Sequence, residues 1–161
     1  ATSTAGWTTG LRQITEWAAK LLHPDVVMLL TPTNDHYLQV VSQSSGTHGS
    51  TPDWTGRRLP LGEGLAGRVF QTQQPMSLAN YHQWDGRSPL FDDPLLYAGL
   101  SVPLVAGDSA LGVVSVFELK AGRVFTERDR ELLETLAIQA AVCLRLAQLT
   151  ALEPAPALEK S

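Results

Sequence analysis

Apolar residues near the start of the chain recur at the spacing of an α-helix. The stripe predicts an amphipathic helix that begins at Thr8 or Thr9, because threonine is a favourable helix-capping residue. The helix should end near His23, because Pro24 disfavours helical backbone in the residue before it. The stripe consists of Leu11, Ile14, Ala18, Leu21 and Leu22.

Five further apolar segments predict β-strands. Residues 26–31 and 110–119 are apolar on both faces, which is typical of strands covered on both sides. Gln39 and Ser42 make the second segment more polar, which favours an edge position. Gly107-Asp108 is a hairpin signal between the last two segments. The five segments are 26–31, 37–42, 76–79, 98–105 and 110–119.

The longest predicted element is a helix from Thr126 to about Leu152. Thr126 is a good N-cap, and Asp129 stands where a capping box has its acidic partner. A helix of this length spans about 40 Å, whereas the radius of gyration of such a domain is about 15 Å. The helix can therefore reach the edge of its own domain and meet a partner. We predict a pairing or signalling seam at Leu133, Leu136, Ala140, Leu144 and Ala147; burial against the domain's own sheet would explain the Ala positions as well.

Two irregular stretches separate these elements. Residues 43–58 are almost wholly polar apart from Trp54, which predicts an exposed loop. Residues 80–94 combine aromatic side chains with Arg87, and this mixture is compatible with two interpretations. The stretch could line a pocket with an apolar wall and a few directional contacts. It could equally be pinned to the body of the domain, with Arg87 paired to Asp85, Asp92 or Asp93.

The order of helices and strands predicts an α+β fold with a central antiparallel sheet of about five to six strands. With 161 residues, 43% of them hydrophobic, the chain has the size and composition of one globular domain. We assign residues 8–150 to that domain. We expect residues 1–7 to be disordered or to be an added N-terminal segment outside the domain. We expect residues 151–161 to form a linker toward an output domain.

Charge and cysteine content exclude several classes of function. A net charge of −4 argues against broad attraction to nucleic acid or to anionic membranes. Cys143 is the sole cysteine, so the chain has no intrachain disulfide and no zinc site built on several thiolates. No apolar run approaches the ~18–20 residues of a membrane span. We expect a cytoplasmic domain.

The short motifs give no evidence of an enzyme. Residues 62–67 match G-x-G-x-x-G, but no buried strand precedes them, so we interpret the glycines as a tight turn into a short helix over 65–72. No catalytic arrangement of Ser, Cys, His and Asp is visible, and the scattered histidines predict no metal site. Cys143 is expected to serve in packing. The histidines are His23, His36, His48 and His82.

Several of these pieces together resemble the GAF domain family over about residues 8–150. The matching pieces are Arg58-Leu59-Pro60-Leu61-Gly62-Glu63-Gly64-Leu65-Ala66-Gly67-Arg68-Val69, Gln74-Pro75, Tyr81-x-x-Trp84-x-Gly86-Arg87-Ser88, Ser101-Val102-Pro103-Leu104, Leu111-Gly112-Val113 and Phe125-Thr126-x-x-Asp129. The resemblance implies a sheet with the terminal helices on one face, often paired in a dimer. It places short helices, loops and a small-molecule pocket on the other face.

The resemblance also narrows the kind of GAF domain. In the family, covalent bilin attachment and methionine-sulfoxide reduction use cysteines in the pocket region. Cys143 lies in the terminal helix, so the resemblance argues against both. Haem would need an axial histidine, for which only His82 is close enough to consider. The cyclic-nucleotide signature is half matched, with Leu119 and Arg130 replacing its Asn and Glu.

We therefore expect a non-enzymatic bacterial sensor domain, of the kind found in two-component and related signalling proteins. A small ligand, not a covalent cofactor or a metal, would be held by the segments 62–72 and 80–97. The signal would pass through the terminal helices of a homodimer to the output domain. The alternative is a ligand-free dimerisation and linker module. The predicted ligand-binding residues are Tyr81, Trp84, Arg87, Ser88, Phe91, Tyr97 and Ser101.

Overall fold

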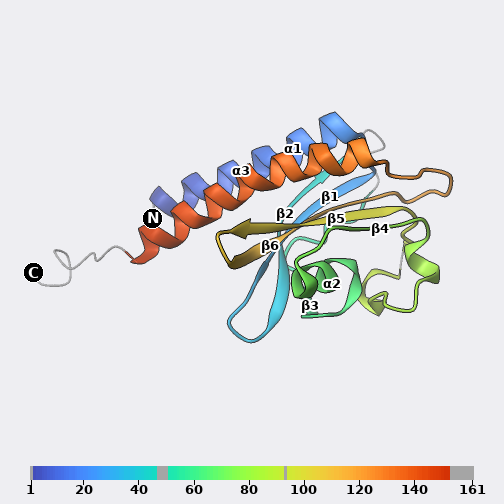
Figure 1. Cartoon of the computed structure of the whole chain (residues 1–161), viewed down its shortest axis with the longest axis horizontal. Helices are drawn as coiled ribbons and strands as arrows, with labels where there is room; N and C mark the ends of the chain where they lie inside the picture. The colour runs from blue at the N-terminus through green and yellow to red at the C-terminus, as the bar shows by residue number, and fades with distance from the viewer. Residues whose placement is uncertain (1, 47–50, 93, 153–161) are drawn as a thin grey trace, which may run out of the picture.

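A six-stranded antiparallel sheet lies between two layers in the computed structural model, which describes residues 2–46, 51–92 and 94–152 (Figure 1). The strand order is β3-β2-β1-β6-β5-β4, so the predicted α+β class and strand number are confirmed. The strands are β1 (Val26–Pro32), β2 (Tyr37–Ser45), β3 (Arg58–Pro60), β4 (Met76–Leu78), β5 (Gly99–Ala106) and β6 (Ser109–Phe117). The helices are α1 (Thr2–Leu22), α2 (Gly64–Thr72) and α3 (Glu127–Leu152), with short 3-10 turns η1 (Tyr81–Gln83) and η2 (Pro89–Phe91).

Both long helices lie side by side on one face of the sheet, which we call the helix-side face (Figure 1). Alternate residues of β1, β5 and β6, such as Leu29, Val102 and Val116, are buried beneath them. The opposite residues of β1 and β6, such as Met28 and Val113, belong to a second core cluster. The two central strands are therefore covered on both sides, as their sequence predicted.

Hydroxyl groups form part of the contact between α1 and β2. The fully buried Thr15 Oγ1 donates to the Arg12 carbonyl at 2.8 Å and lies 3.1 Å from Ser42 Oγ. Ser44 Oγ donates to the same Thr15 oxygen at 3.1 Å. These bonds satisfy polar groups that would otherwise be costly to bury. The contact of α1 with β2 is therefore partly polar.

The other face of the sheet, which we call the pocket-side face, is covered by α2, η1 and η2 (Figure 1). Trp54 is only 2% exposed there, which corrects the prediction that residues 43–58 form a wholly exposed loop. Its backbone N–H donates to Gln43 Oε1 at 2.8 Å, and its ring packs edge-on against Phe91. Burial of this one large apolar residue, together with hydrogen bonds such as that from Gln43 Nε2 to the Pro52 carbonyl, anchors the polar segment.

β2 is not an edge strand, contrary to the prediction. β3 pairs with it through Tyr37↔Pro60, Leu38↔Leu59 and Gln39↔Arg58. The strand was missed because it has three residues and ends in proline. Pro60 is tolerated there because it lies at the end of an edge strand, where a ladder N–H is dispensable.

α1 begins at Thr2, before the predicted cap at Thr8 or Thr9. Residues 2–7 are therefore helical and are not a disordered N-terminus. They contain no proline, so the backbone hydrogen bonding of the helix can continue through them. The predicted linker from residue 153 onward lies outside the described residues.

The β4 edge of the sheet is short. β4 pairs only with Gly99, Ser101 and the residue between them, whereas β5 continues to Ala106. Glu118 N–H donates to the Ala98 carbonyl, so the backbone of Ala98 faces β6. Every second residue after Ala98 faces β6 in the same way, and the residues between them face the other side. Pro103 is one of the latter, so its backbone faces the free edge of the sheet. Pro103 has no N–H to offer at this edge.

α3 starts as the sequence predicted. Thr126 N–H donates to Asp129 Oδ2 at 2.8 Å, and Asp129 N–H donates to Thr126 Oγ1 at 3.2 Å. By length and composition alone, Glu127–Thr150 could cross a membrane, with a mean hydropathy of 1.4. The core helix of a folded domain meets the same criterion, and α3 buries one face against the sheet and α1.

Candidate functional site

The predicted pocket region contains a cavity of only about 10 Å³. That is room for about one water molecule. Met28 and Phe117 of the sheet, Leu65 of α2 and the side chains of Tyr81 and Phe91 form its wall, and Ser115 supplies its one hydroxyl from the sheet. A drug-sized ligand needs a pocket of a few hundred Å³, so side chains of the domain occupy the position expected for a ligand.

Tyr81 closes this cavity from η1. Its ring meets the Phe117 ring edge-on at 5.4 Å, and its hydroxyl accepts a hydrogen bond from Ser88 N–H at 2.7 Å. Burial raises the pKa of the Tyr81 hydroxyl to about 12. Tyr81 is therefore a neutral packing residue at physiological pH.

Phe91 closes the cavity from η2. Its ring packs edge-on against Trp54 at 5.3 Å between ring centres, a geometry that aromatic pairs favour. Ser88 Oγ caps the turn by accepting from Leu90 N–H at 3.3 Å, and Pro89 opens it with a preset φ. The Arg57 guanidinium lies over the Phe91 ring and donates to the Leu90 carbonyl. Contacts on several sides thus hold Phe91 inward.

Several predicted ligand-binding residues lie away from the cavity. Arg87 donates to the Trp84 carbonyl at 3.1 Å and lies 3.9 Å from Asp92. The Trp84 ring lies under the Arg68 guanidinium, with 5.2 Å to the ring centre. These contacts favour the interpretation in which the stretch 80–94 is pinned to the domain. Ligand binding by its residues stays a prediction.

Tyr97 and Ser101 also make contacts within the domain. The Tyr97 ring packs against the His82 ring, with 4.6 Å between their centres. Ser101 Oγ lies 2.7 Å from Ser115 Oγ, and both serines are fully buried. Of the seven predicted residues, Tyr81 and Phe91 line the cavity and Ser88 and Ser101 bond to residues that do so.

Sequence reasoning missed most of the cavity wall. Ser115 of the wall is a polar residue within the otherwise apolar run of β6, and Trp54, which packs behind the wall residue Phe91, is isolated in a polar loop. Both anomalies are visible in the sequence and could have directed attention to them. Met28 and Phe117 carry no such signal, because any apolar strand residue could occupy either face.

Cys143 lies on the helix-side face, beneath α1. A Cβ placed on Gly10 would come within 2.6 Å of its Sγ. Burial raises the pKa of the Cys143 thiol, which disfavours the reactive thiolate. Across the described part of the chain, no three His, Cys, Asp or Glu side chains are grouped closely enough to hold a metal ion.

The predicted pairing seam on α3 points into the domain. Leu133, Leu136, Ala140 and Leu144 are buried in the helix-side core, and Ala147 is half-buried. They therefore face the sheet and α1 and do not form an outward surface. The spacing of the apolar residues identified a buried face, but spacing alone does not show which surface buries it.

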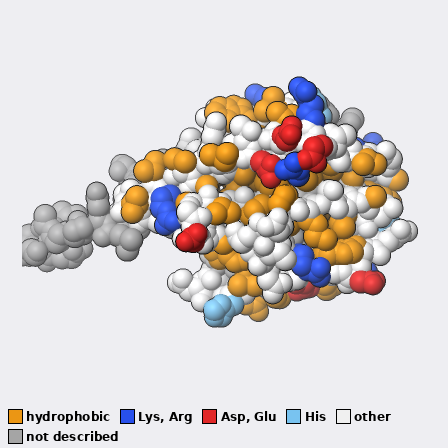
Figure 2. All heavy atoms as spheres, viewed as in Figure 1, with side chains coloured by type: hydrophobic (Ala, Val, Ile, Leu, Met, Phe, Trp, Pro, Cys, Tyr) orange, Lys and Arg blue, Asp and Glu red, His pale blue; other side chains and the backbone are white. Residues whose placement is uncertain are grey.

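A different face of α3 is apolar and exposed, and we call it the α3 stripe. Its residues follow one another at intervals of four, four and three, so they share one side of the helix. Orange side chains follow α3 in Figure 2. The stripe consists of Ile138, Val142, Leu146 and Leu149, which are 66%, 54%, 58% and 52% exposed.

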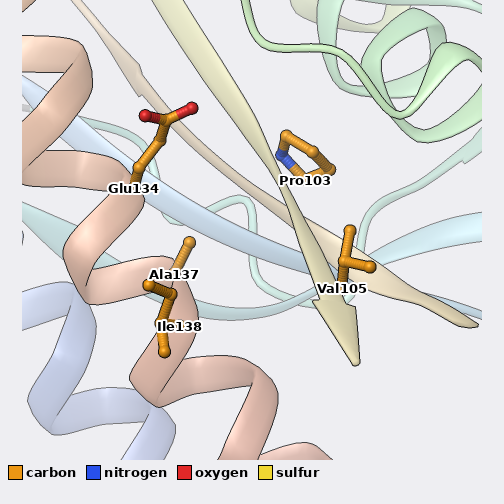
Figure 3. Close-up of a pocket in the computed structure, with 5 residues that line it drawn as sticks. All are labelled: Pro103, Val105, Glu134, Ala137 and Ile138. Atoms are coloured by element: carbon orange, nitrogen blue, oxygen red, sulfur yellow. The ribbon is translucent and has the colours of Figure 1, made fainter. Parts of the chain in front are cut away.

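A groove of about 280 Å³ lies between α3 and the free edge of β5 (Figure 3). Glu134, Ala137 and Ile138 line it from α3, and Pro103 and Val105 from β5. Ile138 belongs both to this groove and to the α3 stripe. The α3 stripe is therefore continuous, through Ile138, with the edge of the sheet.

Comparisons with known proteins agree on the fold. A sequence profile described as "GAF domain" matches residues 6–145. No curated protein sequence matches the chain. Solved structures match most of this chain and most of their own length. Their sequence identities are low, so these matches support the fold and not a shared function.

Three solved structures illustrate the range of relatives. The GAF domain of a phosphoenolpyruvate-protein phosphotransferase from Acinetobacter is 21% identical, with a TM-score of 0.76 over 90% of this chain and 85% of that one. The second GAF domain of DevS from Mycobacterium smegmatis is 23% identical, with a TM-score of 0.72 over 90% and 97%. A type II free methionine-R-sulfoxide reductase from Thermoplasma acidophilum is 14% identical, with a TM-score of 0.72 over 89% and 94%.

The family profile covers most of the chain. The sheet, the two helices on one face and the short helices on the other agree with the fold of the solved GAF domains. The chain belongs to the GAF domain family, a family of sensory and regulatory domains found in signalling proteins.

Proposed function

We propose that this GAF domain is a non-enzymatic regulatory domain that pairs with a second copy of itself through the α3 stripe. Changes in the arrangement of α1 and α3 would then pass to an output domain in the same protein. The observation that carries the proposal is the exposed apolar row on α3, because the outer face of a surface helix in a monomeric domain is normally polar. The cytoplasm of a bacterium is the setting we propose.

The relatives support a regulatory role without specifying the output. Their names place GAF domains in a phosphotransferase, in DevS and in a GAF domain/HD domain protein from Geobacter sulfurreducens. The reductase relative shows that the fold also hosts enzymes. Cys143, the one thiol of this chain, is on the helix-side face with a raised pKa, which argues against thiol chemistry at the pocket.

The size of the stripe predicts a weak dimer. Burying eight half-exposed apolar side chains, four from each copy, would contribute about 8 kcal/mol at about 1 kcal/mol each. Association itself costs about 4–15 kcal/mol. The two magnitudes are similar, so pairing of the isolated domain should depend on concentration, and attached domains should strengthen it.

Sedimentation velocity over a range of concentrations tests the pairing. Leu146→Glu should shift the wild-type equilibrium to monomer, because a dimer would have to bury the new carboxylates. The domain should stay folded, because Leu146 is exposed. Gln71→Glu on the exposed side of α2 is a matched control that should leave the equilibrium unchanged. A dimer of unchanged strength in both Leu146→Glu and Val142→Glu would contradict the proposal.

Leu144 is unsuitable for this test. It is 7% exposed and lies in the helix-side core, so Leu144→Glu would bury a charge and unfold the domain whether or not a dimer forms.

A small-molecule sensor is the second candidate function. The small apolar cavity with the Ser115 hydroxyl in its wall supports it, because that combination suits a ligand with one polar group. Such a ligand would have to displace Phe91. Native mass spectrometry of protein purified from its own cells would reveal a retained small molecule, and Arg87→Ala would then test the predicted role of Arg87 in binding it.

Phe91→Ala provides a second test of the sensor. It should enlarge the cavity and cost about 3–5 kcal/mol of stability. If small aromatic molecules raise the melting temperature of Phe91→Ala and leave the wild type unchanged, Phe91 occupies the ligand position in the resting domain. A mass excess on the wild type that vanishes on denaturation would instead establish a native ligand.

A further inference from the structure

Arg123 lies where the end of α1 meets the start of α3. α1 ends at Leu22, and the chain then enters β1 at Val26. The segment from Glu118 to Thr126 connects β6 to α3 at the same end of the molecule (Figure 1). The side chain of Arg123 bridges these two connections.

The guanidinium of Arg123 caps the C-terminus of α1. Its Nη2 donates to the Leu22 carbonyl at 2.5 Å, and its Nη1 donates to the His23 carbonyl at 3.0 Å. Carbonyls in the last turn of a helix have no partner within the helix, and the negative end of the helix dipole favours a cation there. His23 has φ of 54°, so the helix cannot continue past this point.

The same guanidinium holds the segment that leads into α3. Its Nη1 donates to Glu118 Oε2 at 3.2 Å, and its Nη2 lies 3.9 Å from Asp129 Oδ1. Asp129 in turn caps the first turn of α3 through Thr126. The guanidinium also stacks on the Phe125 ring, with 4.4 Å to the ring centre. The planar fork of arginine makes these simultaneous contacts possible, and a lysine could not reproduce them.

Two acidic groups would repel each other here without Arg123. Glu118 Oε2 accepts from Asp25 N–H at 3.2 Å, while Asp25 Oδ2 accepts from Leu119 N–H at 2.7 Å. Burial, and then the nearby Asp25 carboxylate, raise the pKa of Glu118. Arg123 contacts the Glu118 carboxylate of this pair, and its side chain is 27% exposed.

We propose that Arg123 is a latch that fixes the end of α1 to the start of α3, so that the two helices pivot about this end. The opposite end, where α1 begins and α3 ends, is held by no comparable set of ionic contacts in the described residues. A change at the sheet or at a dimer surface would then appear mainly as a change in the spacing of the helices at that opposite end. This inference is independent of the proposed pairing.

Distances between paired spin labels test the latch. Labels at Lys20 and Glu131 report the latch end, and labels at Thr9 and Gln148, nearer the start of α1 and the end of α3, report the opposite end, all in a Cys143→Ala background. Dilution with unlabelled protein removes distances between copies. In the wild type, the distribution of label-to-label distances at the latch end should be narrower than that at the opposite end. Arg123→Gln should widen it toward that of the opposite end.

Arg128→Gln is the matched control, because it removes the same charge from an exposed position five residues away. It should leave both distributions unchanged. If Arg123→Gln does not fold, Arg123→Lys keeps the charge but loses the fork, and it should widen the latch-end distribution less. A latch-end distribution that is unchanged in a folded Arg123 variant overturns the proposal. Failure of both variants to fold also overturns it, in favour of a purely stabilising role for Arg123.

Discussion

Glu118 is the residue whose ionisation should be most visible in the stability of the domain. Its folded-state pKa is raised above the ordinary value of 4.5 by burial and by Asp25. The folded domain therefore binds this proton more readily than the unfolded chain does. The stabilising contribution of the protonated form is fully present below the unfolded pKa and is lost as pH rises through the folded pKa.

We predict that Glu118→Gln removes this part of the pH dependence. As pH falls from 7 to 4.5, the free energy of unfolding of the wild type should rise relative to that of Glu118→Gln. Urea denaturation at several pH values measures the difference, and Glu131→Gln, at an exposed position on α3, serves as control. The Asp35 carboxyl, whose pKa Arg58 lowers to about 2, titrates below this window. A constant difference between wild type and Glu118→Gln would contradict the prediction.

Single residues also show how far the candidate site could be predicted from the sequence. Tyr81 and Phe91 stood out because aromatic residues in a loop must either pack or bind something. The sequence could not decide between these outcomes, because they depend on residues of distant segments: Trp54 packs against Phe91, and Phe117 packs against Tyr81. For Arg87 the sequence left open a ligand or a carboxylate partner, and the structure shows contacts with the Trp84 carbonyl and Asp92, so its role in ligand binding stays a prediction.

The two long helices are the elements whose contact most limits substitution. Gly10 of α1 lies directly over Cys143 of α3, and an added Cβ would come within 2.6 Å of the sulfur. Overpacking of this kind costs about 1–3 kcal/mol, while alanine in place of glycine within a helix gains up to about 1 kcal/mol. The contact therefore depends on the absence of a side chain at position 10.

We predict that Gly10→Ala lowers the free energy of unfolding by up to about 2 kcal/mol, the difference between these two magnitudes. Cys143→Ala should relieve the collision, so the double variant should be more stable than the sum of the single effects allows. A double-mutant cycle from urea denaturation measures this coupling. A coupling free energy near zero would show that the helices can separate at no cost.

The elements themselves were predicted unequally well. Long apolar runs and capping residues identified α3, β1, β5 and β6, because their signals extend over many residues. β3 escaped because Leu59 stands alone between Arg58 and Pro60, which gives no strand signal, and because its pairing with β2 depends on a distant segment. The inward direction of Leu133 and Leu144 was hidden for the same reason, since only the position of the sheet decides which side of α3 is covered.

At the scale of the whole molecule, α1 begins and α3 ends at the same end of the domain (Figure 1). Segments joined before α1 and after α3 would therefore emerge together, opposite the contacts of Arg123. A small pivot of the helices would be largest where such segments attach. The arrangement suits a domain that passes on a change in geometry, and it needs no enlarged pocket to do so.

Pro103 has a consequence for what happens when many copies of the domain meet. A sheet edge with free N–H groups can template strand addition, by which folded proteins polymerise into fibres. The free edge of β5 adjoins the α3 stripe through their shared groove, so a surface that gathers copies would also bring their sheet edges together. Because Pro103 withholds a donor from that edge, helical association can proceed in a crowded cell without continuous cross-molecule sheets.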